Sequence, residues 1–407
     1  MMIVKPSYYD KFRCTASRCS DNCCIGWEID IDERTDQYYR QVTGDFGKRL
    51  EEGISRDGTP HFRLKGEKER CAFLNDQNLC DIFIHLGEEH LCGICREHPR
   101  FYEWYEDIPG LMDWTETGLG LCCEEAVRLL VSEPFGLVVQ WESEEEQGQW
   151  EKMTGHPQTE EASYLLAVLS ARETVFHLLK GDGNQNGAGP KGLADRSIRI
   201  LQMAEEIQDC MDASGNLAET AESIRKISKY YQQLKLYKKT GKYKENFANE
   251  QGSEYFRQLF SVLRELEPMG DFWLNILNEL DFHIDELLSL AVSRQEKETE
   301  CCKRLMEYMI YRYFGKCAFD GDISSKVRLA VLFAVLVHLM DLNAVRSHGC
   351  LSREAQMEHI RLLSKEIEYS EENLEYLQNA FWSEESCSIE GLSGAVRTLW
   401  GGGSEDK

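Results

Sequence analysis

Cysteine is the residue type most able to do chemistry in this chain, and its distribution is uneven. Ten of the 16 cysteines lie within the first 123 of 407 residues. Two thiols separated by two residues, as in Cys92-x2-Cys95, can hold one metal ion from a single tight turn. Thiolates favour iron–sulfur centres or zinc over hard cations. The spacing therefore predicts a metal centre, for which the available thiols are Cys14, Cys19, Cys23, Cys24, Cys71, Cys80, Cys92, Cys95, Cys122 and Cys123.

The number of thiols bears on the kind of centre. A tetrahedral zinc needs four ligands, and nine or ten thiols exceed that number. Eight would serve two four-cysteine clusters, or one cluster and one zinc. An iron–sulfur cluster is the first expectation and structural zinc the main alternative, while inert buried cysteines are a third interpretation. His98 could also act as a ligand, and Arg96 and Arg100 could either neutralise a cluster or form surface salt bridges.

Charge and hydropathy limit the class of protein. The formal net charge of −25 argues against nucleic acid and anionic membrane as partners, and it would attract a lysine-bearing protein, although solubility alone can explain it. The N-terminus has no apolar core of signal-peptide length. The apolar run Leu329 to Met340 is too short to span a bilayer and predicts a buried helix. We therefore expect a cytoplasmic protein, where disulfides are disfavoured.

Short elements must position the thiols. Trp27 to Ile31 alternates apolar and acidic residues and predicts an extended segment, and a helix is expected over Asp32 to Val42. Asn and Asp within Phe73 to Leu79 indicate a turn between Cys71 and Cys80. A short helical turn is expected at Asp81 to Leu86, and a helix at Cys122 to Val131.

The remainder of the chain predicts an all-α bundle of about eight helices, so the fold class is mainly α. We expect an irregular cysteine-rich metal-binding domain at 1–135, an acidic linker at 136–162, an α-helical domain at 163–400 and a disordered tail at 401–407. The glycine-rich segment Gly181 to Gly192 predicts a loop. Amphipathic stretches are at 163–179, 193–212, 217–240, 253–265, 272–295, 297–315, 325–343, 352–368 and 371–382.

Three strings together resemble a known family. They are FRCTASRCSDNCCIGWEIDID, CAFLNDQNLCDIFIHLGEEHLCGICREHPR and CCEEAVRLL, and they resemble the flagellin lysine-N-methylases and cysteine-rich proteins described as zinc- or iron-chelating. The resemblance is close over about residues 5–131, and the helical remainder matches in character only. By position, the family cysteines fall on Cys14, Cys19, Cys23, Cys24, Cys71, Cys80, Cys92, Cys95 and Cys123.

The resemblance departs from the family pattern at the last motif. Family members commonly have Ser or another residue before that cysteine and Pro after it. Here Cys122 precedes Cys123 and Glu124 follows it, so either thiol of the pair could be the ligand.

The resemblance implies a bacterial enzyme that methylates lysine side chains of flagellin, using S-adenosylmethionine and carrying an iron–sulfur cluster. The alternative is an iron–sulfur or zinc module for electron transfer, structure or partner docking, without methyl transfer. No catalytic and no cofactor-binding residue is assigned. The segment Glu116 to Gly120 lacks the strand and crossover of a nucleotide-binding turn, and the C-x3-C-x2-C triplet is absent. One hypothesis is that a free iron site anchors S-adenosylmethionine.

Overall fold

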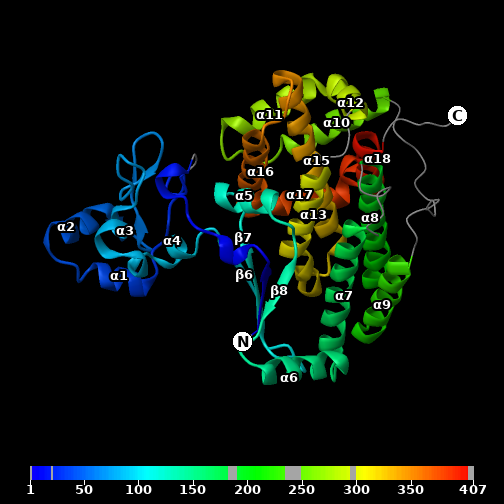
Figure 1. The fold of residues 1–407 in the computed structure, drawn as a ribbon, viewed down its shortest axis with the longest axis horizontal. Helices are drawn as coiled ribbons and strands as arrows, with labels where there is room; N and C mark the ends of the chain where they lie inside the picture. Colours follow the sequence, from blue (N-terminus) through cyan, green and yellow to red (C-terminus); the bar gives the residue numbers. More distant parts are fainter. Residues whose placement is uncertain (1, 20–21, 182–189, 234–248, 294–298, 402–407) are drawn as a thin grey trace.

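The computed structural model describes residues 2–19, 22–181, 190–233, 249–293 and 299–401. Figure 1 shows a small lobe beside a large helical body, with a sheet between them. The chain starts in the sheet, passes through the small lobe and returns to the sheet before it enters the helical body. The mainly α fold class predicted from the sequence is confirmed for the helical body.

The sheet has four strands, which the sequence analysis did not predict. They are β1 (Met2–Pro6), β6 (Arg100–Tyr105), β7 (Trp114–Leu119) and β8 (Leu137–Gln140), in the order β6-β7-β1-β8. β1 runs parallel to β7, whereas the β6–β7 and β1–β8 pairs are antiparallel. All six residues of β7 are buried, so polar and apolar residues do not alternate along it as they do in a half-exposed strand. Glu116 to Gly120 therefore begins as strand and is not a phosphate-binding turn.

A buried ion pair joins this sheet to the helical body. Glu116 on β7 accepts two hydrogen bonds of 2.6 Å from the guanidinium of Arg172 on α7 (Glu160–Lys180), and both side chains are about 5% exposed or less. Tyr311 on α13 (Thr299–Tyr313) donates its hydroxyl proton toward the carbonyls of Val4 and Thr117, at 2.8 and 3.0 Å. Strands β1 and β7 are thus held against two helices by buried polar contacts.

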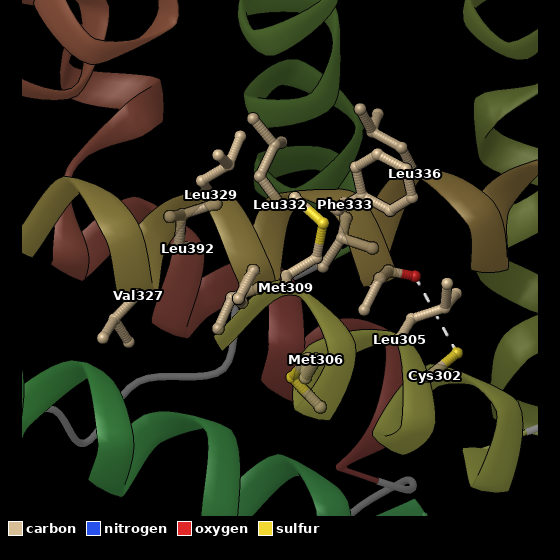
Figure 2. Packing of buried hydrophobic residues seen from close by; sticks show 14 of the residues in the cluster. Cys302, Leu305, Met306, Met309, Val327, Leu329, Leu332, Phe333, Leu336 and Leu392 are labelled. Atoms are coloured by element: carbon tan, nitrogen blue, oxygen red, sulfur yellow. Dashed lines mark hydrogen bonds between the residues drawn. The ribbon is translucent and has the colours of Figure 1, made fainter. Parts of the chain in front are cut away.

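The helical body is centred on α15 (Ile323–His348), which is buried along most of its length. Figure 2 shows Leu332 and Phe333 of this helix packed against Met306 and Met309 of α13. α15 is the one helix in the described part of the chain long and apolar enough to cross a membrane, and its apolar window is wholly buried. The buried helix predicted over Leu329 to Met340 is confirmed.

Most of the predicted helices are present, with shifted ends where those ends are described; residues 234–240, 294–295 and 297–298 of the predicted stretches lie outside the described residues. The predicted 272–295 stretch consists of two helices that meet at His283. Two helices were not predicted: the short α14 (Cys317–Asp320) and the last helix of the body, at Ile389–Trp400. The remaining helices of the body are α8 (Pro190–Ala213), α9 (Leu217–Gln233), α10 (Asn249–Leu263), α11 (Asp271–Phe282), α12 (Ile284–Ser293), α16 (Arg353–Glu368), α17 (Glu371–Ser383) and α18 (Ile389–Trp400).

The acidic segment 136–162 is not an open linker. It contains β8 and α6 (Glu144–Gly155), followed by the first turn of α7. Trp150 packs edge-on against Trp114, with 5.1 Å between ring centroids, and Trp141 lies on the same cluster. The tryptophans anchor this segment to the sheet, and the carboxylates of Glu144, Glu145 and Glu151 on α6 are exposed.

The boundary predicted at residue 135 falls inside one packing unit. Leu119 at the end of β7 and Leu121 just after it belong to the same core as the helices of the body. So do Ala126 and Leu129 of α5 (Glu124–Ser132). The apolar face of α5 has to be covered, and the helical body provides the surface. The small lobe has its own core, whose buried members lie between Ile29 and Cys92.

Several short elements form the small lobe. The helix predicted over Asp32 to Val42 is present as a shorter helix at Glu33–Tyr39, and the helical turn predicted at Asp81–Leu86 is confirmed. Within the segment predicted as extended, Asp30 forms an isolated bridge with His61. The helices of the lobe are α1 (Glu33–Tyr39), α2 (Gly44–Gly53), α3 (Asp81–Leu86) and α4 (Gly93–Glu97). Its strands pair as β2 (Ile54–Ser55) with β3 (His61–Phe62) and β4 (Leu64–Lys65) with β5 (Arg70–Cys71). The predicted loop at 181–192 and the tail at 401–407 lie mostly outside the described residues, as 182–189 and 402–407 are not described.

Removing the carboxylate of the buried ion pair should destabilise the protein strongly. Glu116→Gln leaves the buried guanidinium of Arg172 without its counter-charge, which should cost about 3–5 kcal/mol. Denaturant unfolding measures the change. Glu103→Gln on neighbouring β6 is the control, because Glu103 is partly exposed and pairs with Lys316 at 3.3 Å. The control should lose at most about 1 kcal/mol, and equal losses for both variants would contradict the expectation.

A second prediction concerns pH. Burial raises the pKa of Glu307 on α13 from 4.5 to about 7. Because the native carboxyl holds its proton at higher pH than the unfolded one, wild-type stability should fall as pH rises from about 4.5 through 7. Glu307→Gln removes this loss, so the variant should gain about 2–3 kcal/mol on wild type between pH 5 and pH 8. Unfolding curves at both pH values test this, and exposed Glu375→Gln should show no such gain.

Candidate metal centre

Six thiols of the small lobe lie close enough to influence one another: Cys23, Cys24, Cys71, Cys80, Cys92 and Cys95. A hydrogen bond to Cys23 together with burial raises the pKa of the Cys24 thiol, and the sulfurs of Cys71 and Cys80 add to the rise. A hydrogen bond from Cys95 to Cys92 lowers the pKa of Cys92 and raises that of Cys95. The lobe thus brings thiols from three separate stretches of sequence into one neighbourhood, although no three of the described sulfurs lie within 4.8 Å of one another.

Backbone N–H groups face several of these sulfurs. Burial raises the pKa of Cys71 to about 11 and raises that of Cys80, but in both cases N–H groups of the next turn act in the opposite direction. Such N–H donors stabilise thiolate, the form that binds metal. The donors are Phe73 and Leu74 to Cys71, Ile82 and Phe83 to Cys80, and Ile94 and Cys95 to Cys92.

Asp32 positions the Cys92-x2-Cys95 turn from a distance in sequence. One of its carboxylate oxygens accepts the N–H of Thr35 and caps α1, and the other accepts the N–H of Gly93 at 2.9 Å. Tyr39 of α1 donates its hydroxyl to the carbonyl of His90 at 2.7 Å. α1 therefore holds the turn at two points on either side of Cys92.

A second group of candidate ligands lies where the lobe meets the helical body. Burial raises the pKa of Cys123 to about 12, and the sulfurs of Cys122 and Cys19 contribute to the rise. The Nε2 atom of His98 lies 4.0 Å from Cys122 Sγ. Burial also lowers the pKa of His98 to about 4, so its imidazole is neutral at physiological pH and has a lone pair to offer a metal. We call Cys19, His98, Cys122 and Cys123 the junction group.

The nine cysteines predicted as metal ligands are therefore placed unequally. Six converge in the lobe, and Cys19 and Cys123 belong to the junction group. Cys14 is exposed, and its sulfur accepts the N–H of Ala16 at 3.4 Å. No disulfide joins any of the described cysteines. Their role as ligands stays a prediction.

The other residues proposed near a centre have ordinary roles. Arg96 pairs with its neighbour Glu97 at 3.2 Å. The Arg100 guanidinium lies over the rings of Tyr9 and Phe12, at 5.8 and 5.3 Å from their centroids. These two arginines thus contact an acidic and two aromatic side chains, and a role in neutralising the charge of a cluster stays a prediction.

Four of the six cysteines of the helical body are buried packing residues, while Cys210 is half-buried and Cys350 is exposed. The Cys302 thiol donates to the carbonyl of Ala334 at 3.8 Å within the core (Figure 2). Cys301, Cys317 and Cys387 are likewise buried. The cysteines clustered in the first 123 residues thus lie near other thiols, whereas most of the scattered ones are buried in the core of the helical body.

Sequence reasoning missed the residues of the helical body that border the junction group. Arg312 on α13 is 3.1 Å from the fully buried carboxylate of Glu368, and its guanidinium lies 4.6 Å from the ring centroid of Phe101. Tyr369 contacts Cys122 through its hydroxyl, and this contact counteracts part of the burial that raises the Cys122 pKa to about 12. No local pattern links residues so far apart in sequence, so only the fold could reveal them.

The helical body also carries a groove of about 430 Å³ between α10, residues 385–387 and the start of α18. Helices α10 and α18, which border the groove, lie away from the small lobe (Figure 1). The residues that line it are mainly polar and include Glu254, Glu385 and Glu390. It contains none of the thiols, so it is separate from both cysteine groups.

Comparison with known proteins identifies the family. Residues 192–394 match the family model described as the FliB lysine N-methylase C-terminal domain. The helical body therefore carries a FliB lysine N-methylase C-terminal domain. The match lies in the helical body, so the resemblance extends well beyond residues 5–131, the part where the sequence strings made it close. No solved structure matches the chain.

Three curated relatives match this chain over part of their sequences. The flagellar biosynthetic protein FliU of Salmonella muenchen is 26% identical over 145 residues, which cover 34% of this chain and 81% of that protein. The lysine-N-methylases of Salmonella typhimurium and Salmonella choleraesuis are also 26% identical over 145 residues, which cover 34% of this chain and 34% of each protein. The match thus spans about a third of the two lysine-N-methylases.

Asp32→Ala should loosen the turn that carries Cys92 and Cys95. The substitution removes a helix cap and the acceptor for Gly93, and loss of a cap costs about 0.5–2 kcal/mol. Hydrogen exchange should show faster exchange at Gly93 and Thr35. Glu33→Ala, next in sequence and exposed, is the control and should leave both amides protected. Unchanged protection of Gly93 in Asp32→Ala would show that the carboxylate does not hold the turn.

Proposed function

We propose that this protein transfers methyl groups from S-adenosylmethionine to lysine side chains of a protein, with flagellin as the substrate, and that its thiols hold an iron–sulfur cluster. The observation that carries the proposal is the lysine N-methylase family match over the helical body. The names of the relatives support the reaction and the flagellar context.

The donor set supports a metal–thiolate centre in the lobe. The six converging thiols are partly or wholly withdrawn from water, except Cys23, and burying that many thiolates without a cation would be costly. The raised pKa values of Cys24, Cys71, Cys80 and Cys95 mean that these thiols keep their protons at neutral pH until a metal replaces them. The backbone N–H groups aimed at Cys71, Cys80 and Cys92 are the surroundings that such sulfurs need.

The spacing of the thiols favours a cluster over a single zinc. Zinc–sulfur distances of about 2.3 Å place the sulfurs of one tetrahedral site about 3.8 Å apart. Among the described residues, no three cysteine sulfurs lie within 4.8 Å of one another. A cluster of several irons does not require its sulfurs to lie as close together as the ligands of one zinc ion do, so an iron–sulfur cluster is the first proposal. Zinc remains the alternative metal.

Methyl transfer places a clear demand on the protein. A lysine ammonium has a pKa of about 10.4 and must lose its proton before its nitrogen can attack. The N–C bond to the methyl then forms as the bond from that carbon to the sulfonium sulfur breaks, leaving S-adenosylhomocysteine. The net charge of −25 favours approach of a cationic lysine segment, and binding in a less polar site favours loss of the proton.

Metal and sulfide analysis of protein purified without oxygen tests the centre. Wild type should contain iron with acid-labile sulfide and absorb near 400 nm. Cys92→Ser should lose most of the metal, at least tenfold, because it removes a buried ligand from the converging group. Cys210→Ser, a half-buried thiol of the helical body, is the control and should retain it. Stoichiometric zinc without sulfide would replace the cluster by the zinc alternative.

Mass spectrometry of flagellin tests the reaction. Flagellin incubated with the reconstituted protein and methyl-labelled S-adenosylmethionine should gain labelled methyl groups on lysine. Cys92→Ser should lower the rate at least tenfold and Cys210→Ser should not. A protein that holds its cluster yet transfers no methyl to flagellin or to other lysine-rich proteins would refute the enzymatic part and favour an iron–sulfur module that docks a partner.

A further inference from the structure

The outer face of the small lobe carries a compact set of metal-binding side chains that the thiol chemistry does not use. The ligand atoms of Glu28, Asp30 and His61 all lie within 4.8 Å of one another. The Nε2 atom of His61 is 3.4 Å from a carboxylate oxygen of Glu28. The two acidic residues are exposed, and the imidazole is mostly buried.

A short backbone ladder places these three residues on one face. The N–H of Phe62 donates to the carbonyl of Ile29 at 3.1 Å, and the N–H of Ile31 donates to the carbonyl of Pro60 at 2.7 Å. Asp30 lies opposite His61 in this ladder. Residues two apart on an extended segment share a face, so Glu28 and Asp30 project together while Ile29 and Ile31 enter the core of the lobe.

The orientation of His61 is set by its other nitrogen. Nδ1 lies 2.9 Å from the carbonyl oxygen of Thr59, and a carbonyl can only accept, so Nδ1 carries a proton. In the neutral ring the lone pair is therefore on Nε2, which faces the carboxylates. A backbone carbonyl that fixes the ring in this way is the usual partner of a metal-binding histidine.

The geometry points to a divalent transition-metal site of the zinc class formed by Glu28, Asp30 and His61. Ligand atoms about 2.0–2.2 Å from a tetrahedral zinc are about 3.3–3.5 Å apart, which matches the distance between His61 and Glu28. Two carboxylates and a neutral imidazole carry a charge that a divalent cation balances. The imidazole favours zinc, copper, iron or nickel over magnesium or calcium, and the two carboxylates also suit manganese.

This site is separate from the thiol centre and does not depend on the proposed methyl transfer. Its ligands project from the ladder on the side opposite Ile29 and Ile31, which pack with Cys71 and Cys92 in the lobe core. A bound cation would join residues 28–30 to residue 61. It would therefore fasten together two segments that frame the thiol-bearing core.

Manganese is the probe that distinguishes this site from the thiols, because Mn²⁺ prefers oxygen and imidazole ligands to thiolates. Full-length protein with its thiol centre loaded is titrated with Mn²⁺ and followed by electron paramagnetic resonance. We expect one Mn²⁺ per chain, displaced by Zn²⁺. The double variant Glu28→Gln with Asp30→Asn should bind at least tenfold more weakly, and so should His61→Ala. Glu67→Gln, an exposed carboxylate of the same lobe, should bind as wild type does.

The double variant changes only exposed groups to their amides, so it should keep the fold, and circular dichroism checks this. Its content of metal and sulfide in the thiol centre should equal that of wild type. The inference is overturned if wild type binds no Mn²⁺ beyond the level of the double variant, or if His61→Ala binds as tightly as wild type. Loss of the thiol centre in the folded double variant would overturn the separation of the two sites.

Discussion

The bidentate contact between Glu116 and Arg172 governs how the parts of this protein are joined. Both groups are withdrawn from water, so each charge is tolerated only because the other faces it. The contact fixes the central strand β7 against α7. In the sheet, β1 and β6 lie on either side of β7. In the sequence, the small lobe lies between β1 and β6, and β7 is followed directly by Cys122 and Cys123. Through β7 and its neighbouring strands, this buried ion pair therefore determines the position of both thiol groups relative to the helical body.

Much of this arrangement could be predicted from sequence, because the patterns that indicate it each lie within a short stretch of the chain. The density of cysteines, the C-x2-C pair and the helical turn at Asp81–Leu86 are all encoded within a few residues. Helical periodicity likewise revealed most of the bundle, because each helix buries one stripe of its surface. α18 was missed, although its buried residues follow the same logic.

The sheet and the division into parts could not be predicted in this way. β7 reads WTETGL and is buried on both faces, so its polar residues find partners inside the protein, and alternation gives no signal. The acidic stretch at 136–162 has the composition of a linker, but Trp141 and Trp150 tie it to the sheet. The partners of the junction group were equally hidden, since Cys19, Cys122 and Tyr369 meet only after the chain has folded.

The junction group also shows why the lobe and the helical body have to be considered together. Lys365 and Tyr369, which lie within the family-matched region, act on His98 and Cys122 of the cysteine-rich region: the first helps to lower the histidine pKa, and the second contacts the thiol. A neutral His98 beside buried thiols depends on this neighbouring positive charge as well as on burial. The ligand chemistry of the cysteine-rich region is thus set partly by the helical body, so a fragment carrying only the cysteines would have different surroundings at its second thiol group.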